Sequence, residues 1–203
     1  MTNIIEFPIQ KTKSGFKKVH KEPEIRLNYT GQLNLFNQES PERNIFIMPS
    51  SLSPFEEALM LDEKGEQNAK EAYRIAIEKN DYIADAYCNL GILEFESGNT
   101  VKAIDSFTKS LKNDPRHFES HYNLANLYSE LGNLPLAKTH YEFARELKPD
   151  FPDTCFNLGL VYAMSRDFES AIKILSEYKE MASSEDSTNA EKLIESIKKI
   201  TGN

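Results

Sequence analysis

A period of 34 residues dominates the second half of the sequence and constrains the fold more than any other feature. The 34 residues from Ala84, ADAYCNLGILEFESGNTVKAIDSFTKSLKNDPRH, align without a gap with the 34 residues from Phe118. A third copy begins at Pro152. Because a repeat of this length corresponds to one supersecondary unit, the sequence predicts a row of similar units that stack on one another.

The aligned copies agree at residues that suit a pair of antiparallel helices. Gly98 and Gly132 permit the left-handed backbone that ends a first helix, and Pro115 and Pro149 stop a second helix because proline lacks an amide hydrogen. Small residues allow two helices to approach closely, and large apolar residues fill the seams. The equivalent positions are Asn89, Asn123 and Asn157; Leu90, Leu124 and Leu158; Gly91, Ala125 and Gly159; Ala103, Ala137 and Ala171; and Phe107, Tyr141 and Leu175.

The pattern resembles the tetratricopeptide repeat, strongly over residues 84 to about 183. The resemblance implies an all-α, right-handed solenoid of helical hairpins that acts as a non-catalytic protein interaction module. One period earlier, Ala69, Tyr73, Ala76 and Asp81 fit the second-helix positions, while Glu56 and Glu57 replace the Leu and Gly of the first helix. We therefore expect about four repeats with a degenerate first one. The expected division is a partly disordered leader (1–51), repeats at 52–83, 84–117, 118–151 and 152–185, and a capping helix at 188–201.

The C-terminal end departs from the repeat pattern. Arg166 replaces the turn glycine and Ser183 the final proline, so we expect a less regular last repeat. Thr188 and Glu191 have capping-box spacing, which predicts that a closing helix begins there. Its apolar stripe would hide the last face of the stack. That stripe comprises Leu193, Ile194, Ile197 and Ile200.

Charge and composition limit the classes of partner. The formal net charge is −8, although residues 1–50 carry seven Lys or Arg and five Asp or Glu. The net negative charge of the chain as a whole therefore does not favour binding to nucleic acid. There is no apolar run long enough to span a bilayer and no secretory signal, so we expect a cytoplasmic protein without a membrane partner. Cys88 and Cys155 fit reduced structural thiols.

The sequence predicts neither an enzyme nor a cofactor site. It contains no glycine-rich phosphate loop and no GxSxG sequence. His117 and His121 are four residues apart, a spacing that suits a shared metal, but no HExxH pattern accompanies them. His121 falls in the same packing position as Tyr87 and Cys155, and His117 lies in the loop just before its helix, so we expect no metal.

Function is then expected on the concave face, which the first helices of tetratricopeptide hairpins line. An asparagine amide can donate to and accept from an extended peptide backbone, so Asn89, Asn123 and Asn157 predict a ladder for a peptide. Alternatively, these asparagines serve packing. Inward positions of the family correspond here to Asp85, Cys88, Asn89, Ile92, Phe95, Glu119, Tyr122, Asn123, Asn126, Ser129, Asp153, Phe156, Asn157, Leu160 and Met164. The candidate partner-binding residues among them are Asp85, Asn89, Ile92, Tyr122, Asn123, Asn126, Phe156, Asn157 and Leu160.

Acidic residues exclude one known use of the family. Chaperone-binding members hold a C-terminal carboxylate with basic residues and asparagines. Here Asp85, Glu119 and Asp153 stand where positive charge would be required. The groove should instead favour apolar side chains flanked by Lys or Arg.

The leader itself has this character. It contains Lys11, Lys13, Lys17, Lys18 and Lys21, followed by RLNYTGQLNLF and NIFIMPSS. We expect partial docking of residues 25–50 on the repeats, and we expect the preceding half, which is poor in apolar residues, to be solvated.

Two other interpretations of the leader remain open. Gln32, Leu33, Leu35 and Phe36, in the sequence QLNLF, resemble the peptide by which bacterial proteins bind the replication sliding clamp, which implies an adaptor of that clamp. The basic leader also permits a regulator that contacts nucleic acid, although prolines leave little room there for a DNA-binding domain.

Overall fold

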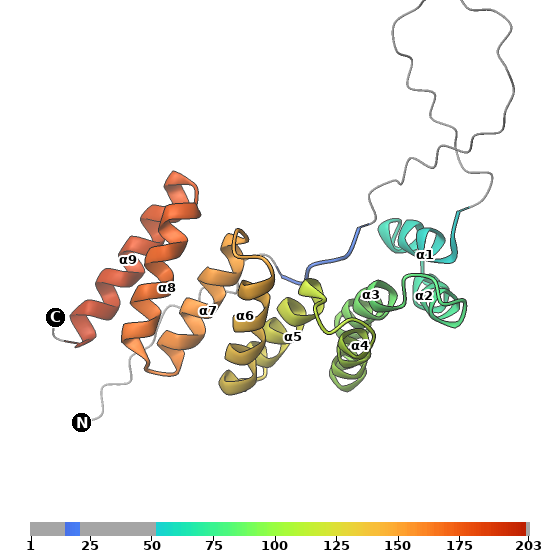
Figure 1. Cartoon of the computed structure of the whole chain (residues 1–203), viewed down its shortest axis with the longest axis horizontal. Coiled ribbons are helices and arrows are strands. Elements are labelled where there is room, and N and C mark those ends of the chain that lie inside the picture. The colour runs from blue at the N-terminus through green and yellow to red at the C-terminus, as the bar shows by residue number, and fades with distance from the viewer. Residues whose placement is uncertain (1–14, 21–51, 202–203) are drawn as a thin grey trace, which may run out of the picture.

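The computed structural model describes residues 15–20 and 52–201, and within these residues it contains nine α-helices and no strand. Figure 1 shows the helices side by side in a row. They are α1 (Pro54–Glu63), α2 (Ala69–Glu78), α3 (Ile83–Glu96), α4 (Thr100–Asn113), α5 (Phe118–Glu130), α6 (Leu134–Leu147), α7 (Pro152–Met164), α8 (Phe168–Met181) and α9 (Ser184–Thr201).

Consecutive helices pack in pairs, α1 on α2, α3 on α4, α5 on α6 and α7 on α8, and α9 closes the row against α8. The first helices also contact one another, α3 with α5 and α5 with α7, so they form one layer and the second helices form the other. The predicted all-α solenoid of helical hairpins is confirmed.

The predicted helix ends follow the turn chemistry. Gly98 and Gly132 have φ angles of 78° and 72°, in the left-handed region that favours glycine. α4 and α6 stop two residues before Pro115 and Pro149, respectively. At the first helix, Ser53 and Glu56 form a capping box, in which each side chain accepts a hydrogen bond from the backbone N–H of the other residue.

The small residues mark the closest approach of paired helices, as predicted. A Cβ atom on Gly91 would lie 2.8 Å from Cε1 of Phe107, and one on Gly159 would lie 2.7 Å from Cγ of Leu175. Both distances are shorter than a normal carbon–carbon contact. The glycines therefore let large side chains of the second helix lie directly on the backbone of the first.

The C-terminal expectations need two corrections. α9 begins at Ser184, not at Thr188, because Ser183 Oγ accepts the N–H of Asp186 and Thr188 lies inside the helix, where its hydroxyl donates to the carbonyl of Ser184. The last repeat is also as regular as its neighbour, since α7 and α8 have the lengths of α5 and α6, 13 and 14 residues. Arg166 adopts a φ of 61° and takes the role of the missing glycine.

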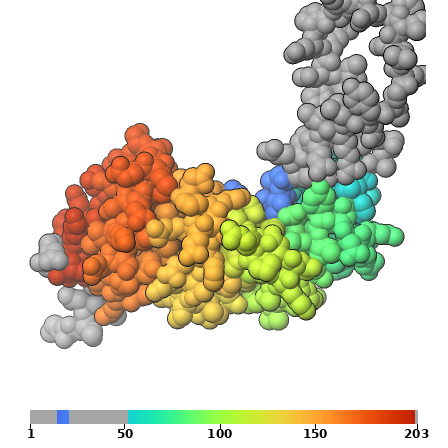
Figure 2. All heavy atoms as spheres, in the orientation of Figure 1, coloured from blue at the N-terminus to red at the C-terminus, as the bar shows by residue number. Residues whose placement is uncertain are grey.

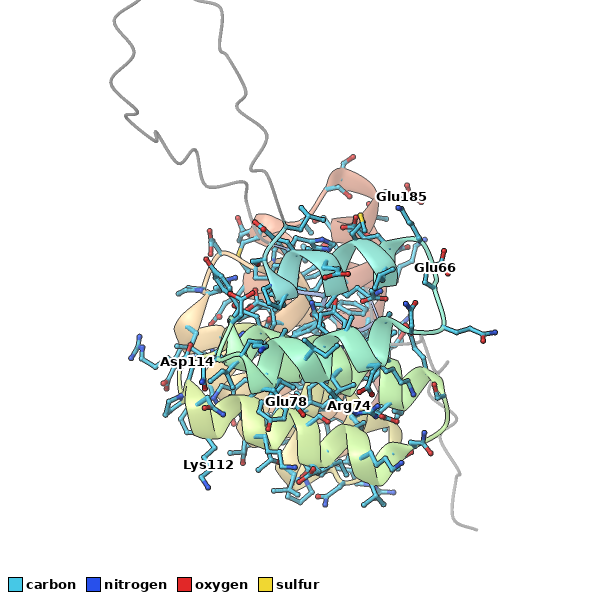
Figure 3. All side chains as sticks on the ribbon, turned by 90° about the vertical axis from the view of Figure 1, so that its right-hand side faces the viewer. Glu66, Arg74, Glu78, Lys112, Asp114 and Glu185 are labelled. Carbon is cyan, nitrogen blue, oxygen red and sulfur yellow. The ribbon has the colours of Figure 1, made fainter. Side chains whose placement is uncertain are left out.

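Charged side chains cover the outside of the stack. Figure 3 shows Lys112 projecting outward from α4, and Lys112 and Glu78 are both exposed. The apolar side of each helix faces the stack instead, as for Ala190, Ile194 and Ile197 of α9. None of the described helices is both long and apolar enough to cross a membrane.

Candidate functional site

Residues 15–20, GFKKVH, lie along the layer of first helices and follow it in the direction opposite to the repeats. Gly15 contacts α5 and His20 contacts α1. Figure 2 shows the blue atoms of this segment beside the cyan and green atoms of the first two hairpins. We call residues 15–20 the docked segment.

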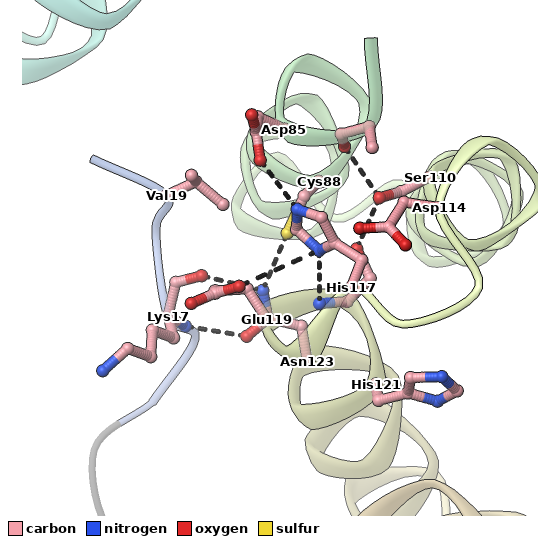
Figure 4. Close-up of polar contacts among 12 residues, drawn as sticks. Lys17, Val19, Asp85, Cys88, Ser110, Asp114, His117, Glu119, His121 and Asn123 are labelled. Atoms are coloured by element: carbon pink, nitrogen blue, oxygen red, sulfur yellow. Dashed lines mark hydrogen bonds and ion pairs between the residues drawn. The ribbon is translucent and has the colours of Figure 1, made fainter. Parts of the chain in front are cut away.

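Two asparagines bind the backbone of the docked segment with both the oxygen and the nitrogen of their side-chain amide groups. Asn123 Oδ1 accepts the N–H of Lys17 at 2.7 Å, and its Nδ2 donates to the carbonyl of Lys17 at 2.9 Å. Asn89 forms the same two hydrogen bonds with Val19: its Oδ1 accepts the N–H at 2.8 Å, and its Nδ2 donates to the carbonyl at 3.0 Å. The Lys17 pair is visible in Figure 4. Pairing of alternate residues on one side is the pattern of an extended strand, and each carboxamide replaces one residue of a neighbouring strand.

A third asparagine extends these contacts by one turn of α5. Asn126 Nδ2 donates to the carbonyl of Gly15 at 2.7 Å, and its Oδ1 accepts the Tyr141 hydroxyl. Asn89, Asn123 and Asn126 are all at most 1% exposed. Buried amides need hydrogen-bond partners, so the segment backbone satisfies groups that would otherwise cost stability.

The side chain of Phe16 lies among aromatic residues of the second hairpin. Its ring centroid is 4.5 Å from that of Phe95 and 6.1 Å from that of Phe107, with the Phe107 ring almost parallel. Phe16 also packs against the apolar cluster that includes Ile92 and Leu124. We call this place the aromatic subsite.

The side chain of Lys18 reaches a buried carboxylate at the end of α1. Lys18 Nζ lies 2.6 Å from Asp62 Oδ1, and the Asp62 side chain is only 3% exposed. Asp62 Oδ2 accepts the Tyr73 hydroxyl at 3.0 Å. Burial, reinforced by the charge of Asp62, raises the pKa of Tyr73, so Tyr73 stays a neutral donor. We call the place beside Asp62 the cation subsite.

The remaining side chains of the segment make looser contacts. The ammonium of Lys17 lies 4.1 Å from the centroid of Phe151, in the turn before α7. His20 Nδ1 is 3.4 Å from Glu63, and both side chains are more than half exposed.

The structure separates the candidate partner-binding residues into groups. Asn89, Asn123 and Asn126 contact the segment, whereas Asn157 donates to the Tyr122 hydroxyl and to Asn126 Oδ1. Asp85 accepts a hydrogen bond from His117. The other candidates serve the core, three of them at most 1% exposed and one packed against it at its edge. These are Ile92, Tyr122 and Phe156, and Leu160.

The docked segment corrects the expectation for the first half of the leader. That half was expected to be solvated, but residues 15–20 are held by backbone hydrogen bonds and by an ion pair with the buried carboxylate of Asp62. The expectation weighed only the scarcity of apolar residues. The predicted docking of residues 25–50 and the clamp-like residues Gln32–Phe36 lie outside the described residues.

Sequence reasoning also missed Asp62, Phe107 and Phe151. Asp62 follows the apolar run ALML of α1, and an acidic residue at the end of such a run is the available signal of a buried carboxylate. Phe107 lies on the second helix of its hairpin, whereas the candidate binding residues were taken only from the first helices.

The polar cluster beside the segment serves helix capping and packing. His117 Nδ1 accepts the N–H of Ser120, so Nε2 carries the proton that is donated to Asp85 at 2.8 Å. Burial raises the pKa of the nearby Cys88 thiol to about 12. A thiol with this pKa is not ionised near neutral pH and is a poor nucleophile.

Comparison with known proteins agrees with this geometry. Two tetratricopeptide repeat models match residues 67–118 and 106–139. The family models thus recognise tetratricopeptide repeats within residues 67–139. Human tetratricopeptide repeat protein 8 is 27% identical over 100 residues, which are 49% of this chain and 18% of that protein. The chain thus matches less than a fifth of this relative.

Solved tetratricopeptide structures share the fold. A crystal structure of MamA superposes with a TM-score of 0.63 at 20% identity, over 71% of this chain and 84% of that one. The first tetratricopeptide domain of Spaghetti, bound to the HSP90 peptide SRMEEVD, gives a TM-score of 0.52 at 21% identity, over 59% of this chain and 96% of that one. At these identities the likeness establishes the fold alone.

Proposed function

We propose that this tetratricopeptide array is a protein interaction module that binds an extended peptide in the groove of α1, α3 and α5. The observation that carries the proposal is the two-sided pairing of Asn89 and Asn123 with alternate residues of a peptide backbone. These amides recognise main-chain groups that every peptide carries, so the docked segment occupies the groove as a peptide ligand would.

The electrostatic character of the groove supports a basic ligand. Asp62 and Glu63 face Lys18 and His20 of the segment. A free C-terminal carboxylate would meet these acids, so we expect internal, basic peptide segments as ligands rather than acidic chain ends. Lys17 and Lys18 contact an aromatic ring and a carboxylate of this groove. These contacts favour a protein ligand over nucleic acid.

A peptide library tests the proposal. In the full chain, Lys17→Pro with Val19→Pro removes the two N–H groups that Asn123 and Asn89 accept, which should vacate the groove. Random peptides selected on this variant should bind it and lose binding when Asn89→Ala and Asn123→Ala are added. Absence of any enriched peptide, or undiminished binding after the asparagine substitutions, would refute the proposal. Circular dichroism must show equal helix content in all variants.

A further inference from the structure

The docked segment carries information about which peptides the groove selects. We infer that the groove prefers an extended partner segment with an aromatic residue followed two positions later by lysine, and that residues 15–20 compete with this partner. The inference rests on the proposed function. It goes further because it identifies the partner by its side chains and assigns the docked segment a regulatory role.

The aromatic subsite selects by shape. Phe16 lies against Phe95 and Phe107 and against the apolar cluster of α3, α4 and α5. Aromatic rings add favourable quadrupole contacts to the burial of their area, which aliphatic side chains cannot reproduce. An alanine here would leave the Phe95 and Phe107 rings without their partner ring.

The cation subsite selects by charge. The Asp62 side chain is almost fully buried, and its partners in the described part of the chain are Lys18 and the neutral Tyr73 hydroxyl. A buried carboxylate that loses its counter-ion is costly, so a neutral side chain at the place of Lys18 would weaken binding strongly.

The neighbouring positions tolerate more variation. Lys17 lies over Phe151 as a partly exposed cation, an interaction that is weak when solvated. The His20 contact with Glu63 is exposed. Selectivity therefore concentrates at Phe16 and Lys18, which are separated by one residue.

The covalent connection makes the segment a strong competitor. Residues 21–51 join the docked segment to α1, and the described residues on either side of them lie at α1, where His20 contacts Glu63 and Ser53 caps the helix. A ligand tethered through a short chain acts at an effective concentration on the order of millimolar. If the untethered segment binds the groove with a dissociation constant of tens of micromolar, any free partner would bind on the order of tenfold or more weakly while the segment is present.

A labelled peptide tests both parts of the inference. The probe is a fluorescein-labelled peptide with the sequence of residues 13–21, KSGFKKVHK, and the readout is its anisotropy with the full chain. The variant Phe16→Ala with Lys18→Ala weakens the internal segment and leaves the groove unchanged. This variant should bind the probe about tenfold or more tightly than the unsubstituted chain does. Equal affinities would overturn the competition.

Substituted probes test the selectivity on the same full-length variant. Probes with alanine at the place of Phe16 or of Lys18 should bind about tenfold or more weakly, whereas alanine at the place of Lys17 should cost less than about threefold. With Asp62→Asn added, the probe that lacks the Lys18 charge should bind as well as the parent probe. Equal binding of all probes would overturn the selectivity and leave the proposed function standing. No binding of any probe to the weakened chain would refute both.

Discussion

Asn123 and Lys17 are 106 residues apart in sequence and form a two-way hydrogen-bonded pair, one amide group against one residue of backbone. Asn89 and Val19 repeat the relationship one structural unit earlier. Because each net hydrogen bond contributes about 0.5 to 1.5 kcal/mol, the four bonds together are strong enough to hold a short segment.

The first prediction concerns this pair of asparagines. Asn89→Ala with Asn123→Ala should release the docked segment, so hydrogen exchange at the amides of Lys17 and Val19 should accelerate by about tenfold or more. Asn99→Ala is the matched control, since it removes an amide that binds Glu94 outside the groove. Unchanged protection in the double variant would show that the asparagines do not hold the segment.

The repeat itself was predictable because its period places equivalent residues in equivalent environments. Gly91, for example, indicates a close helix approach from the sequence alone, and the structure shows that Phe107 makes the contact. The docked segment was not predictable from composition, because hydrogen bonds to its backbone and one buried carboxylate hold it as much as apolar burial does. Main-chain recognition leaves little trace in the bound sequence.

A second prediction concerns the helix contact at Gly91. Gly91→Ala places a Cβ 2.8 Å from Cε1 of Phe107, so the ring or the helix must shift. We expect a loss of about 1 to 3 kcal/mol in the free energy of unfolding, measured by urea titration. Ser176→Ala on the exposed side of α8 serves as control and should change it by less than about 0.5 kcal/mol. Equal urea midpoints for Gly91→Ala and the parent chain would mean that the Phe107 ring or the helix shifts at little cost in stability.

A third prediction contrasts Leu124, which lies within α5, with Leu131 at the C-terminal end of that helix. Leu124 is 2% exposed in the cluster beneath the segment, and Leu131 is 54% exposed. Leu124→Asp buries an unpaired charge and should abolish the cooperative thermal transition, whereas Leu131→Asp should leave it nearly unchanged. A transition of Leu124→Asp within a degree or two of the parent would contradict the core position of Leu124.

A fourth prediction uses the left-handed backbone of Arg166. At a φ of 61° a side chain strains the backbone, and glycine does not. Arg166→Gly should therefore raise stability by about 1 kcal/mol, which corresponds to roughly 2 to 4 °C in Tm for a chain of this size. The reciprocal change Gly132→Ala should lower Tm. A decrease in both variants would exclude backbone strain as the dominant effect at Arg166.

A fifth prediction concerns pH. His121 and His140 lie with their Nδ1 atoms 3.0 Å apart, between α5 and α6. Burial, with the neighbouring His121, lowers the pKa of His140 to about 4, and burial is also the main cause that lowers the pKa of His121. An unfolded histidine has a pKa of about 6.5, so the unfolded chain binds more protons between about pH 6.5 and pH 4.

Stability from this pair is therefore complete above about pH 6.5 and is lost as pH falls toward 4. For His140 the loss at pH 5 should be about 2 kcal/mol, and His140→Gln should remove most of it. Urea titrations of both proteins at pH 7 and pH 5 measure the difference. Parallel losses in the two proteins would assign the acid sensitivity to other groups.

The spacing of the asparagine contacts has a consequence for alignment. Residues 34 apart in the array, Asn89 and Asn123, pair with residues two apart in the segment, Val19 and Lys17. Successive repeats of the array therefore pair with every second residue of the docked segment. A chain that slides by two residues meets the same amides again, so the backbone contacts alone leave the register degenerate. Side-chain contacts such as those of Phe16 with Phe95 and of Lys18 with Asp62 fix it. A ligand with tandem copies of the aromatic and lysine pattern would then occupy the groove in more than one frame.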